Sequence, residues 1–319
     1  MPCYSPLKGF KSKETGGIVF KRSKEAGAAM EVACGQCLGC RLDRTRMWAT
    51  RICHESSLYD DDGGNSFITL TYDDDHLPPD GGLRKSDFQK FMKRLRKFFP
   101  QKVRYFMCGE YGDQCVHGLE KCPYCGHLHR PHYHAILFNC WFQDLALYKD
   151  AEGYYVYTSP TLEKLWGKGF VTVGEVTYDS AAYVASYCVK KITGRQADDW
   201  YIKLNLETGE LCEVVPEYAT MSRKPGIGRA WYEKYKDDVF PSDEVPVPGK
   251  GVFKKAPRYY ESICESEAPE VLEEIKRVRE VFRREHGDNY TPDRLMAAYN
   301  IKKKELAIKE TRKLGYDAK

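Results

Sequence analysis

The stretch Arg130-Pro-His-Tyr-His-Ala-Ile-Leu-Phe138 decides how the rest of the sequence is interpreted. Its length and apolar content predict a strand, in which successive side chains point to opposite faces of a sheet. His132 and His134 therefore share one face, about 7 Å apart, while Tyr133 lies on the other. Two imidazoles at this spacing can bind one metal ion, although the same pattern also occurs in half-exposed strands without a metal.

Glu110 strengthens the metal interpretation, because it ends the preceding predicted strand. An antiparallel neighbour brings such a carboxylate beside the histidine pair. Two histidines and one carboxylate hold a metal ion and leave open positions for a substrate oxygen. A solvated carboxylate at the end of a strand is the alternative interpretation of Glu110.

The composition indicates a folded chain whose cysteines are metal ligands or buried thiols rather than disulfides. The 319 residues are 42% hydrophobic and 30% charged, enough to bury one large core or two ordinary ones. No stretch approaches about 18 consecutive apolar residues, and the first residues have no apolar run, so neither a membrane span nor a secretory signal is expected. Thirteen cysteines without an export signal predict a reducing cytosol, where clustered cysteines bind metal or are buried as thiols.

Positive charge is concentrated although the net charge is only +4. Residues 1–58 contain ten Lys and Arg against five Asp and Glu, and residues 84–104 contain nine against one. Such clusters favour nucleic-acid binding, because neutralised phosphates release counterions. An ordinary solvated face is the alternative.

The pattern of apolar residues predicts an α+β fold with a central antiparallel sheet and helices on one side of it. Strands are expected over 67–72, 103–107, 133–138 and 170–176. Helices are expected over 41–58, 87–99, 181–193, 268–286 and 292–313. Ser86 is the expected N-cap of the second helix. The last two helices, both highly charged, form a helical C-terminal region.

A second constellation is Tyr183-Val-Ala-Ser-Tyr187-Cys-Val-Lys190. On a helix, Tyr187 lies about 40° from Tyr183 and Lys190 about 20°, while the apolar residues face the other way. Two phenols and an ammonium therefore project together, unless the tyrosines merely cover the edge of the helix. With the metal group, this arrangement suggests phosphoryl transfer to tyrosine, Lys190 stabilising the phenolate or the phosphoryl charge.

Three segments, FITLTYDD, RPHYHAILF and YVASYCVKK, resemble in order and spacing the motifs of the HUH endonucleases that initiate rolling-circle replication. The Tyr-x-x-x-Tyr-x-x-Lys arrangement is similar to that of the replication initiators of the Microviridae. CGQCLGCR near the start and MSRKPGIGRAWYEKY at 221–235 resemble the gokushovirus subgroup. The resemblance extends over residues 34–260.

This resemblance implies an HUH fold with RRM-like topology and the tyrosine helix across the edge of the sheet. It implies a nick in single-stranded origin DNA that leaves a 5′-phosphotyrosine and a free 3′-OH, with Mg²⁺ or Mn²⁺ held by Glu110, His132 and His134. Tyr187 is then the principal nucleophile, and Tyr183 takes the next transfer. A host polymerase and helicase are the expected partners, and the host cytoplasm is the expected location.

An insertion at residues 112–130 departs from the family pattern. Cys122-x-x-Cys125 has the spacing of a zinc knuckle, and Cys115 with a histidine completes four ligands. The fourth ligand is one of three histidines, His127, His117 or His129. We expect structural Zn²⁺ here; free surface cysteines are the alternative.

A second zinc site is expected from Cys34, Cys37 and Cys40, with Cys3 or Cys53 as the fourth ligand. Buried reduced thiols are an equal alternative. An iron–sulfur cluster is a third, although the spacing matches neither ferredoxin pattern.

The sequence divides into a Cys-rich segment with a basic helix (1–58), an HUH endonuclease domain with the zinc insertion (59–240) and a charged helical region (241–319). Other HUH nickases, namely plasmid initiators, relaxases and transposases, are the near alternatives. A non-enzymatic zinc protein that binds nucleic acid and a metallohydrolase that uses water as nucleophile are the more distant ones.

Overall fold

The computed structural model describes residues 3–24, 26–59, 63–112, 128–151, 154–187, 196–205 and 207–311. These residues form two compact units. Of the described residues, those up to Thr45 and those from Glu273 onward form unit 1, and Arg46–Leu272 belong to unit 2. The three-part division expected from the sequence differs from these units and stays a prediction.

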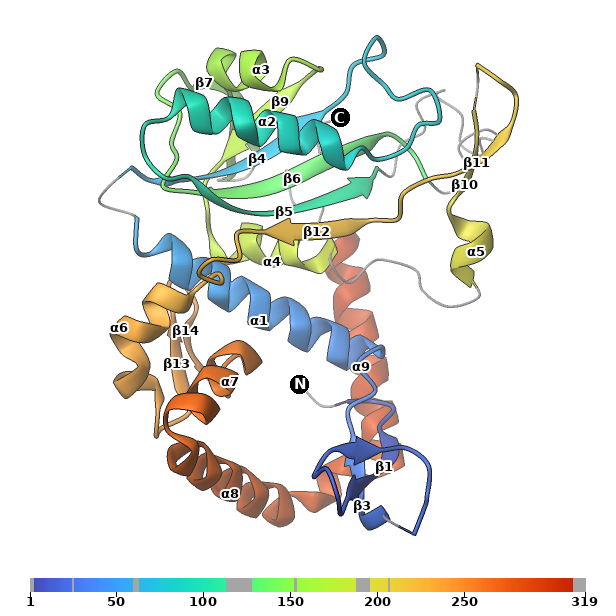
Figure 1. The fold of residues 1–319 in the computed structure, drawn as a ribbon, viewed down its shortest axis with the longest axis vertical. Helices are drawn as coiled ribbons and strands as arrows, with labels where there is room; N and C mark the ends of the chain where they lie inside the picture. The colour runs from blue at the N-terminus through green and yellow to red at the C-terminus, as the bar shows by residue number, and fades with distance from the viewer. Residues whose placement is uncertain are drawn as a thin grey trace. The chain divides into compact units, whose positions relative to one another are not determined.

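Unit 2 is built on a seven-stranded antiparallel sheet with the strand order β12-β5-β6-β4-β9-β8-β7 (Figure 1). Its strands are β4 (Asn65–Thr71), β5 (Arg104–Tyr111), β6 (Pro131–Phe138), β7 (Ala146–Ala151), β8 (Tyr154–Thr158), β9 (Val171–Gly174) and β12 (Tyr218–Met221). Every neighbouring pair runs antiparallel. The predicted α+β class with a central antiparallel sheet is therefore confirmed.

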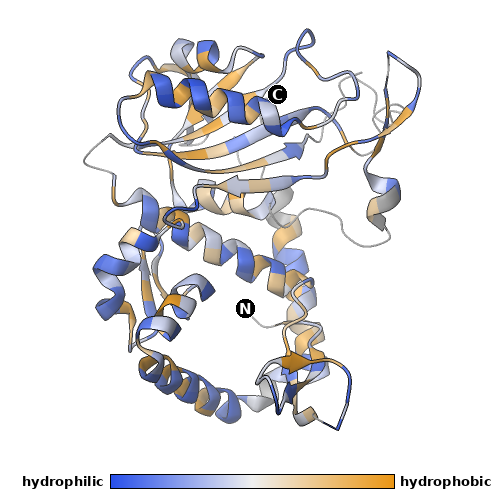
Figure 2. Ribbon diagram, viewed as in Figure 1, coloured by the Kyte–Doolittle hydropathy of each residue, from blue (hydrophilic) through white to orange (hydrophobic). Residues whose placement is uncertain are grey.

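One face of the sheet forms the main core, beneath α2 (Lys85–Phe98) and α3 (Pro160–Trp166). The apolar side of α2 packs onto this face, and its outer side is hydrophilic (Figure 2). Tyr133 and Trp166 are fully buried between sheet and helices. Burying a large apolar side chain stabilises the fold by about 1.5–3 kcal/mol, so this face supplies much of the stability.

The start of α2 differs from the expectation that Ser86 caps it. The N-cap residue is Arg84, which makes no side-chain capping bond, and Ser86 lies in the first turn. The Tyr133 hydroxyl instead accepts from Arg84 N at 2.9 Å and donates to Arg84 O at 2.9 Å. A buried phenol on the sheet thus fixes the start of the helix, and this tertiary contact replaces the local capping signal.

The opposite face of the sheet is also covered, so the expectation of helices on one side was wrong. Helix α4 (Tyr178–Tyr187) contacts the central strands β5 and β6. Helix α1 (Leu38–Ser56) adds Trp48, whose ring lies 5.0 Å from that of Phe106 on β5. The tyrosine helix therefore lies across a face of the sheet and not across its edge, because its rings pack on residues of the central strands.

The remainder of unit 2 packs in two places: the segment before β12 adds Tyr201 and Val214 to the main core, and the elements of the unit after β12 surround the end of α1. Its elements are α5 (Gln196–Trp200), β10 (Ile202–Leu204), β11 (Leu211–Glu213), α6 (Arg229–Val239), β13 (Glu244–Val247), β14 (Gly251–Lys254) and α7 (Arg258–Glu267). His54 of α1 stacks on Trp231 of α6 at 3.5 Å and bonds through Nδ1 to the Tyr260 hydroxyl of α7. Burial lowers the pKa of His54 to about 4, so the ring is neutral near pH 7 and acts as a packing element.

A buried ion pair connects α1 to the sheet. Glu55 Oε1 accepts from Arg104 Nε at 2.5 Å, and both side chains are almost fully buried. The other Glu55 oxygen accepts from Gly228 N at 2.7 Å, and Arg104 also donates to Pro225 O at 2.8 Å. The pair therefore links α1, β5 and the segment that leads into α6.

Unit 1 contains a small sheet of β1 (Leu7–Ser12), β2 (Ile18–Val19) and β3 (Ala26–Val32) in the order β2-β1-β3. Its helical elements are the first residues of α1, most of α8 (Pro269–Glu285), the 3₁₀ turn Gly287–Tyr290 and α9 (Pro292–Thr311). The two C-terminal helices thus agree closely with the predicted ranges. None of the described helices is long and apolar enough to cross a membrane.

We predict that Glu55→Gln lowers the free energy of unfolding by about 3 kcal/mol, because it leaves the Arg104 charge buried without its partner. The measurement is the midpoint of urea unfolding. Glu233→Gln is the matched control, because it breaks an exposed pair with Arg229 and should cost less than about 1 kcal/mol. Equal effects of the two substitutions would contradict the prediction.

Candidate active site

Glu110, His132 and His134 converge at one end of the central strands. Glu110 on β5 is paired directly with His132 on β6, and His134 lies two residues along the same face. Glu110 Oε1 lies 2.7 Å from His132 Nε2 and 2.9 Å from His134 Nε2. The three side chains offer ligand atoms within 4.8 Å of one another. We call them the acid–histidine group.

Hydrogen bonds behind the two imidazoles aim their Nε2 atoms at Glu110. His132 Nδ1 lies 3.2 Å from the carbonyl oxygen of Arg130, and His134 Nδ1 lies 2.9 Å from Thr69 Oγ1 on β4. Metal-binding histidines are usually held in this way by a carbonyl or a polar side chain at the second nitrogen. The donor set therefore fits a divalent cation bound by two Nε2 atoms and one carboxylate oxygen.

The hydrogen-bond partners of His132 are consistent with that fit. Each of its ring nitrogens faces an oxygen that accepts, Arg130 O on one side and Glu110 on the other. An imidazolium satisfies both acceptors. A divalent cation held by the acid–histidine group would take the place of the proton on Nε2, and Arg130 O would still accept from Nδ1 of a neutral imidazole.

Glu110 is an ionised carboxylate although it is only 4% exposed. Burial by itself raises the pKa of this group, but the neighbouring charges and hydrogen bonds of His132 and His134 outweigh burial and lower the pKa to about 2. The Glu110 carboxylate is therefore negatively charged near neutral pH. A buried charge of this kind requires cationic partners.

Two tyrosines of α4 lie against the acid–histidine group. The ring of Tyr187 stacks on that of His134 with centroids 5.4 Å apart, and the ring of Tyr183 meets it edge-on at 5.2 Å. The two phenol rings are 4.8 Å apart, one helical turn from each other. Tyr187 is buried and Tyr183 half-buried, and Tyr183 also contacts Phe67 of β4.

Local sequence explains why α4 starts where it does. Ser180 N donates to Thr177 Oγ1 at 3.2 Å, and Thr177 N donates to Ser180 Oγ at 2.8 Å, a reciprocal cap. The helix begins at Tyr178, three residues before the predicted start, so Ser180 lies in its first turn. On the far side of the helix Ala181, Val184 and Ala185 are buried. Both sides of α4 are thus covered, and its orientation is fixed.

Several predicted site residues lie outside the part of the chain that the structure describes. They are Lys190 and the ligands expected in the insertion, Cys115, Cys122, Cys125 and His127. No sequence motif pointed to Thr69 as a site residue. Its place in the alternating segment FITLTY nevertheless puts it on the metal-binding face. The other cysteine group is brought together in unit 1, with Cys3 beside Cys34, Cys37 and Cys40. Cys53 is buried in unit 2 and is not part of that group.

Comparison with known proteins gives the family. Residues 65–192, which span β4 to α4, match the family model of the replication-associated protein ORF2/G2P. The chain is 36% identical to replication-associated protein VP4 of Bdellovibrio phage phiMH2K, over 85% of this chain and 79% of the relative. The chain belongs to this family of phage replication-associated proteins.

Two further members of the replication-associated protein family support the assignment. Replication-associated protein ORF2 of Spiroplasma virus 4 is 31% identical over 88% of this chain and 86% of the relative. Replication-associated protein ORF4 of Chlamydia phage 1 is 32% identical over 50% of this chain and 38% of the relative. The resemblance to proteins of the Microviridae is thereby confirmed. No solved structure matches the chain significantly.

We predict that Thr69→Val weakens Mn²⁺ binding about 10-fold, because it removes the hydrogen bond that orients His134 without changing the size of a buried side chain. Electron paramagnetic resonance of free Mn²⁺ during a titration measures this affinity without any reaction. The control is Thr71→Val, two residues along β4, whose hydroxyl bonds to Phe170 O instead. Equal affinities of the two variants would remove Thr69 from the site.

Proposed function

We propose that this phage replication-associated protein nicks single-stranded origin DNA through a phosphotyrosine intermediate and rejoins strands, starting and ending rolling-circle replication. The observation that carries the proposal is the contact of two tyrosine rings with His134 of the acid–histidine group. A phenol is a weak nucleophile near pH 7, so it needs a site that orients it and balances charge on the phosphate. Membership of the replication-associated family supports the same function.

The proposed reaction exchanges one ester for another. The tyrosine oxygen attacks phosphorus, an O–P bond to tyrosine forms, and the bond from phosphorus to the 3′-oxygen breaks. The phenol loses its proton and the leaving 3′-oxygen gains one, so no nucleotide cofactor is consumed. The phosphotyrosine ester keeps the energy of the original ester, which allows a later hydroxyl to reseal the strand.

The residues of the site have distinct proposed roles. Mg²⁺ or Mn²⁺ bound by Glu110, His132 and His134 supplies a Lewis acid for the scissile phosphate. Glu110 brings the negative charge that retains the cation, and the outer hydrogen bonds of the two histidines hold their Nε2 atoms in position. Lys190 is proposed to stabilise the phenolate or the phosphoryl charge.

Two nucleophiles suit a cycle that needs two cuts. Replication by this route ends with the protein attached to one 5′ end while a second nick is still to be made. Tyr187 and Tyr183 lie at similar distances from the His134 ring, 5.4 and 5.2 Å, so one metal site can serve both. We propose Tyr187 as the principal nucleophile and Tyr183 as the one that takes the next transfer.

The wider proposal follows the family resemblance. The sheet with the acid–histidine group on β5 and β6 and the tyrosine helix across it supports an HUH endonuclease fold in residues 59–240. Structural Zn²⁺ in the insertion remains a proposal, as do a host polymerase and helicase as partners and the host cytoplasm as location. The placement of both tyrosines beside His134 favours a tyrosine nucleophile over water, and catalysis over passive binding.

We predict that Tyr187→Phe loses most of the covalent adduct with labelled single-stranded origin DNA and Mn²⁺, while Tyr183→Phe forms adduct but releases few closed circles. The double variant should form none. The measurement is a denaturing gel, on which the adduct survives detergent. Tyr178→Phe is the control, because this third tyrosine of α4 packs on Phe253, away from the acid–histidine group.

Normal circle release by Tyr183→Phe would show that only one nucleophile acts. Metal-dependent turnover without any trapped adduct, in the unsubstituted protein, would favour a hydrolase that uses water. Binding without metal-stimulated cleavage would favour the non-enzymatic alternative.

A further inference from the structure

Four cysteines of unit 1 bring their sulfur atoms to one point. Cys3 precedes β1, Cys34 follows β3, Cys37 lies just before α1, and Cys40 lies in its first turn. The Sγ atom of Cys3 lies 3.6 Å from that of Cys34 and 3.7 Å from that of Cys37. All four sulfur atoms lie within 4.8 Å of one another.

These separations match a single bound metal ion. A disulfide requires sulfur atoms about 2.0 Å apart. Tetrahedral zinc with Zn–S bonds of about 2.3 Å places its sulfurs about 3.8 Å apart, close to the separations of 3.6 and 3.7 Å between Cys3 Sγ and its two neighbours. The four thiols are also only half-buried, whereas Cys53, Cys108 and Cys140 are buried in the ordinary way of core cysteines.

Backbone amides around the cluster point at the sulfurs. Tyr4 N donates to Cys37 Sγ at 3.3 Å, Cys34 N to Cys3 Sγ at 3.3 Å, and Cys37 N to Cys34 Sγ at 3.2 Å. Amide donors stabilise negative charge on sulfur, which is the form that binds metal. The segments before β1 and before α1 are therefore folded around the four sulfurs.

We propose that Cys3, Cys34, Cys37 and Cys40 bind one structural Zn²⁺ as four thiolates. Four protein ligands close the coordination shell, so this zinc has no open position for chemistry. The site is independent of the nicking reaction and of any zinc in the insertion. It assigns Cys3 as the fourth ligand, which the spacing of the other three left open.

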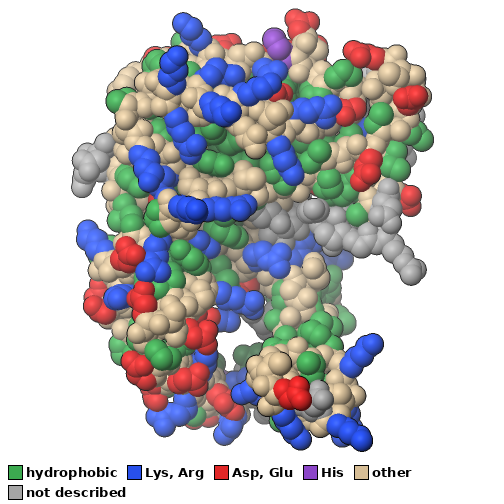
Figure 3. Space-filling view, in the orientation of Figure 1, with side chains coloured by type: hydrophobic (Ala, Val, Ile, Leu, Met, Phe, Trp, Pro, Cys, Tyr) green, Lys and Arg blue, Asp and Glu red, His purple; other side chains and the backbone are tan. Residues whose placement is uncertain are grey.

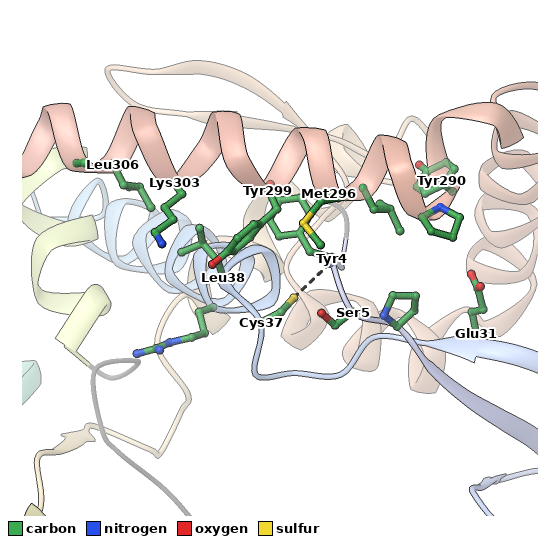
Figure 4. A pocket seen from close by; sticks show the side chains of 15 residues that line it. Tyr4, Ser5, Glu31, Cys37, Leu38, Tyr290, Met296, Tyr299, Lys303 and Leu306 are labelled. Atoms are coloured by element: carbon green, nitrogen blue, oxygen red, sulfur yellow. Dashed lines mark hydrogen bonds between the residues drawn. The ribbon is translucent and has the colours of Figure 1, made fainter. Parts of the chain in front are cut away.

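The zinc site organises the rest of unit 1. It joins the start of β1, the end of β3 and the first turn of α1. Tyr4, next to Cys3, meets Tyr299 of α9 edge-on with ring centroids 5.7 Å apart. Figure 4 shows Tyr4 between Cys37 and Tyr299, at one side of a cavity of about 840 Å³ along α9. Loss of the ion should therefore also loosen the packing of α9.

Elemental analysis of the full-length protein, purified without chelator, tests the site. Cys37→Ser should lower the zinc content by one ion per chain relative to the unsubstituted protein. Cys212→Ser, a partly exposed cysteine on β11, is the control and should leave the content unchanged. An unchanged zinc content in Cys37→Ser, or iron in place of zinc, would overturn the proposal.

A second measurement needs no variant. In the unsubstituted protein, the four cluster thiols should be alkylated slowly until a chelator is added, and Cys212 should react at one rate throughout. Peptide mass spectrometry separates these cysteines from those of the insertion. Equal rates for the cluster thiols with and without chelator would also overturn the proposal.

An independent feature of unit 2 is a basic groove of about 520 Å³ where β5 begins. Its lining residues include five cations and no acidic residue, and the cations are Arg96, Lys102, Arg104, Arg223 and Lys224. Lys and Arg side chains also gather over α2 (Figure 3). The groove differs from the surface of α2 because its cations come from two segments, 96–104 and 222–224, which line it together.

Hydrogen bonds hold the two sides of the groove together. Ser222 N donates to Tyr105 O at 2.9 Å, and Tyr105 N donates to Ser222 Oγ at 3.1 Å, next to the pairing of β12 with β5. Arg104 is bound to Glu55 and to Pro225 O, so its charge is already balanced. These contacts hold the segment that carries Arg223 and Lys224 against the start of β5.

Three of the other four cations of the groove are available for an anion, and the fourth, Arg96, donates to Val103 O. Lys102, Arg223 and Lys224 are exposed, and none of them takes part in an ion pair among the residues that the structure describes. The groove lies near Arg104, six residues along β5 from Glu110, which corresponds to about 20 Å. A DNA strand at the acid–histidine group can extend that far through its flanking nucleotides.

We propose that this groove binds the sugar–phosphate backbone of single-stranded DNA outside the cleaved step. The proposal rests on the proposed function and adds a contact that positions DNA and reads no sequence. Two lost phosphate contacts should lower the slope of log K against log salt by about 1.4 for single strands. The loss should be similar for different sequences.

Fluorescence anisotropy with a labelled single-stranded oligonucleotide, at several salt concentrations and in EDTA, tests the groove without any cleavage. Arg223→Ala with Lys224→Ala should weaken binding and lower the slope. Lys90→Ala with Lys93→Ala, on the exposed side of α2, removes equal charge. This control should change the affinity and the slope less than the groove variant does. Equal effects of the two double variants on the affinity and the slope, or no effect of either, would overturn the proposal that the groove binds DNA. Absence of a covalent adduct in the unsubstituted protein would instead refute the nicking reaction.

Discussion

The pairing of β5 with β6 is the constraint on which the site depends. It sets Glu110 opposite His132 and, through the alternation of the strand, places His134 on the same face. A slip of one residue would send both histidines into the apolar core and Tyr133 to the site. The apolar side of the pair resists such a slip, because Tyr133, Ala135 and Leu137 are all fully buried. The core therefore determines the geometry of the polar face.

The large apolar cluster and the acid–histidine group lie on opposite faces of the sheet. One face carries the large apolar cluster beneath α2 and α3. The other face carries buried charges, each with partners: Glu110 with two histidines, and Glu55 with Arg104 and a backbone amide. Buried charges are tolerated only when paired in this way. The charged groups of the second face lie among buried apolar side chains, those of Phe67, Phe106 and Ile136.

The two groups of metal ligands differ in kind. Imidazole and carboxylate suit a cation that keeps open positions for a phosphate oxygen, whereas four thiolates form a closed shell. The first group lies in unit 2 against the tyrosine helix, and the second lies in unit 1 between small secondary-structure elements. One arrangement is suited to reaction and the other to holding a small sheet and a helix start together.

The sequence by itself determined what depends on local periodicity. Alternation in 130–138 set the shared face of His132 and His134, helical spacing set the amphipathic α2, and one turn of helix set Tyr183 beside Tyr187. The order and spacing of the motifs also gave the family. These features could be predicted because each depends on residues close together in the chain.

Only the tertiary structure decided the partners that come from distant segments. Thr69 behind His134, Cys3 as the fourth cysteine of the cluster, and Arg84 in place of Ser86 at the start of α2 each follow from contacts between separate elements. The position of α4 on a face of the sheet also differed from the expected position across its edge, because helical spacing alone does not determine which strands a helix contacts. Periodicity tells which side of an element a residue occupies, but strand pairing and packing decide what lies opposite that side.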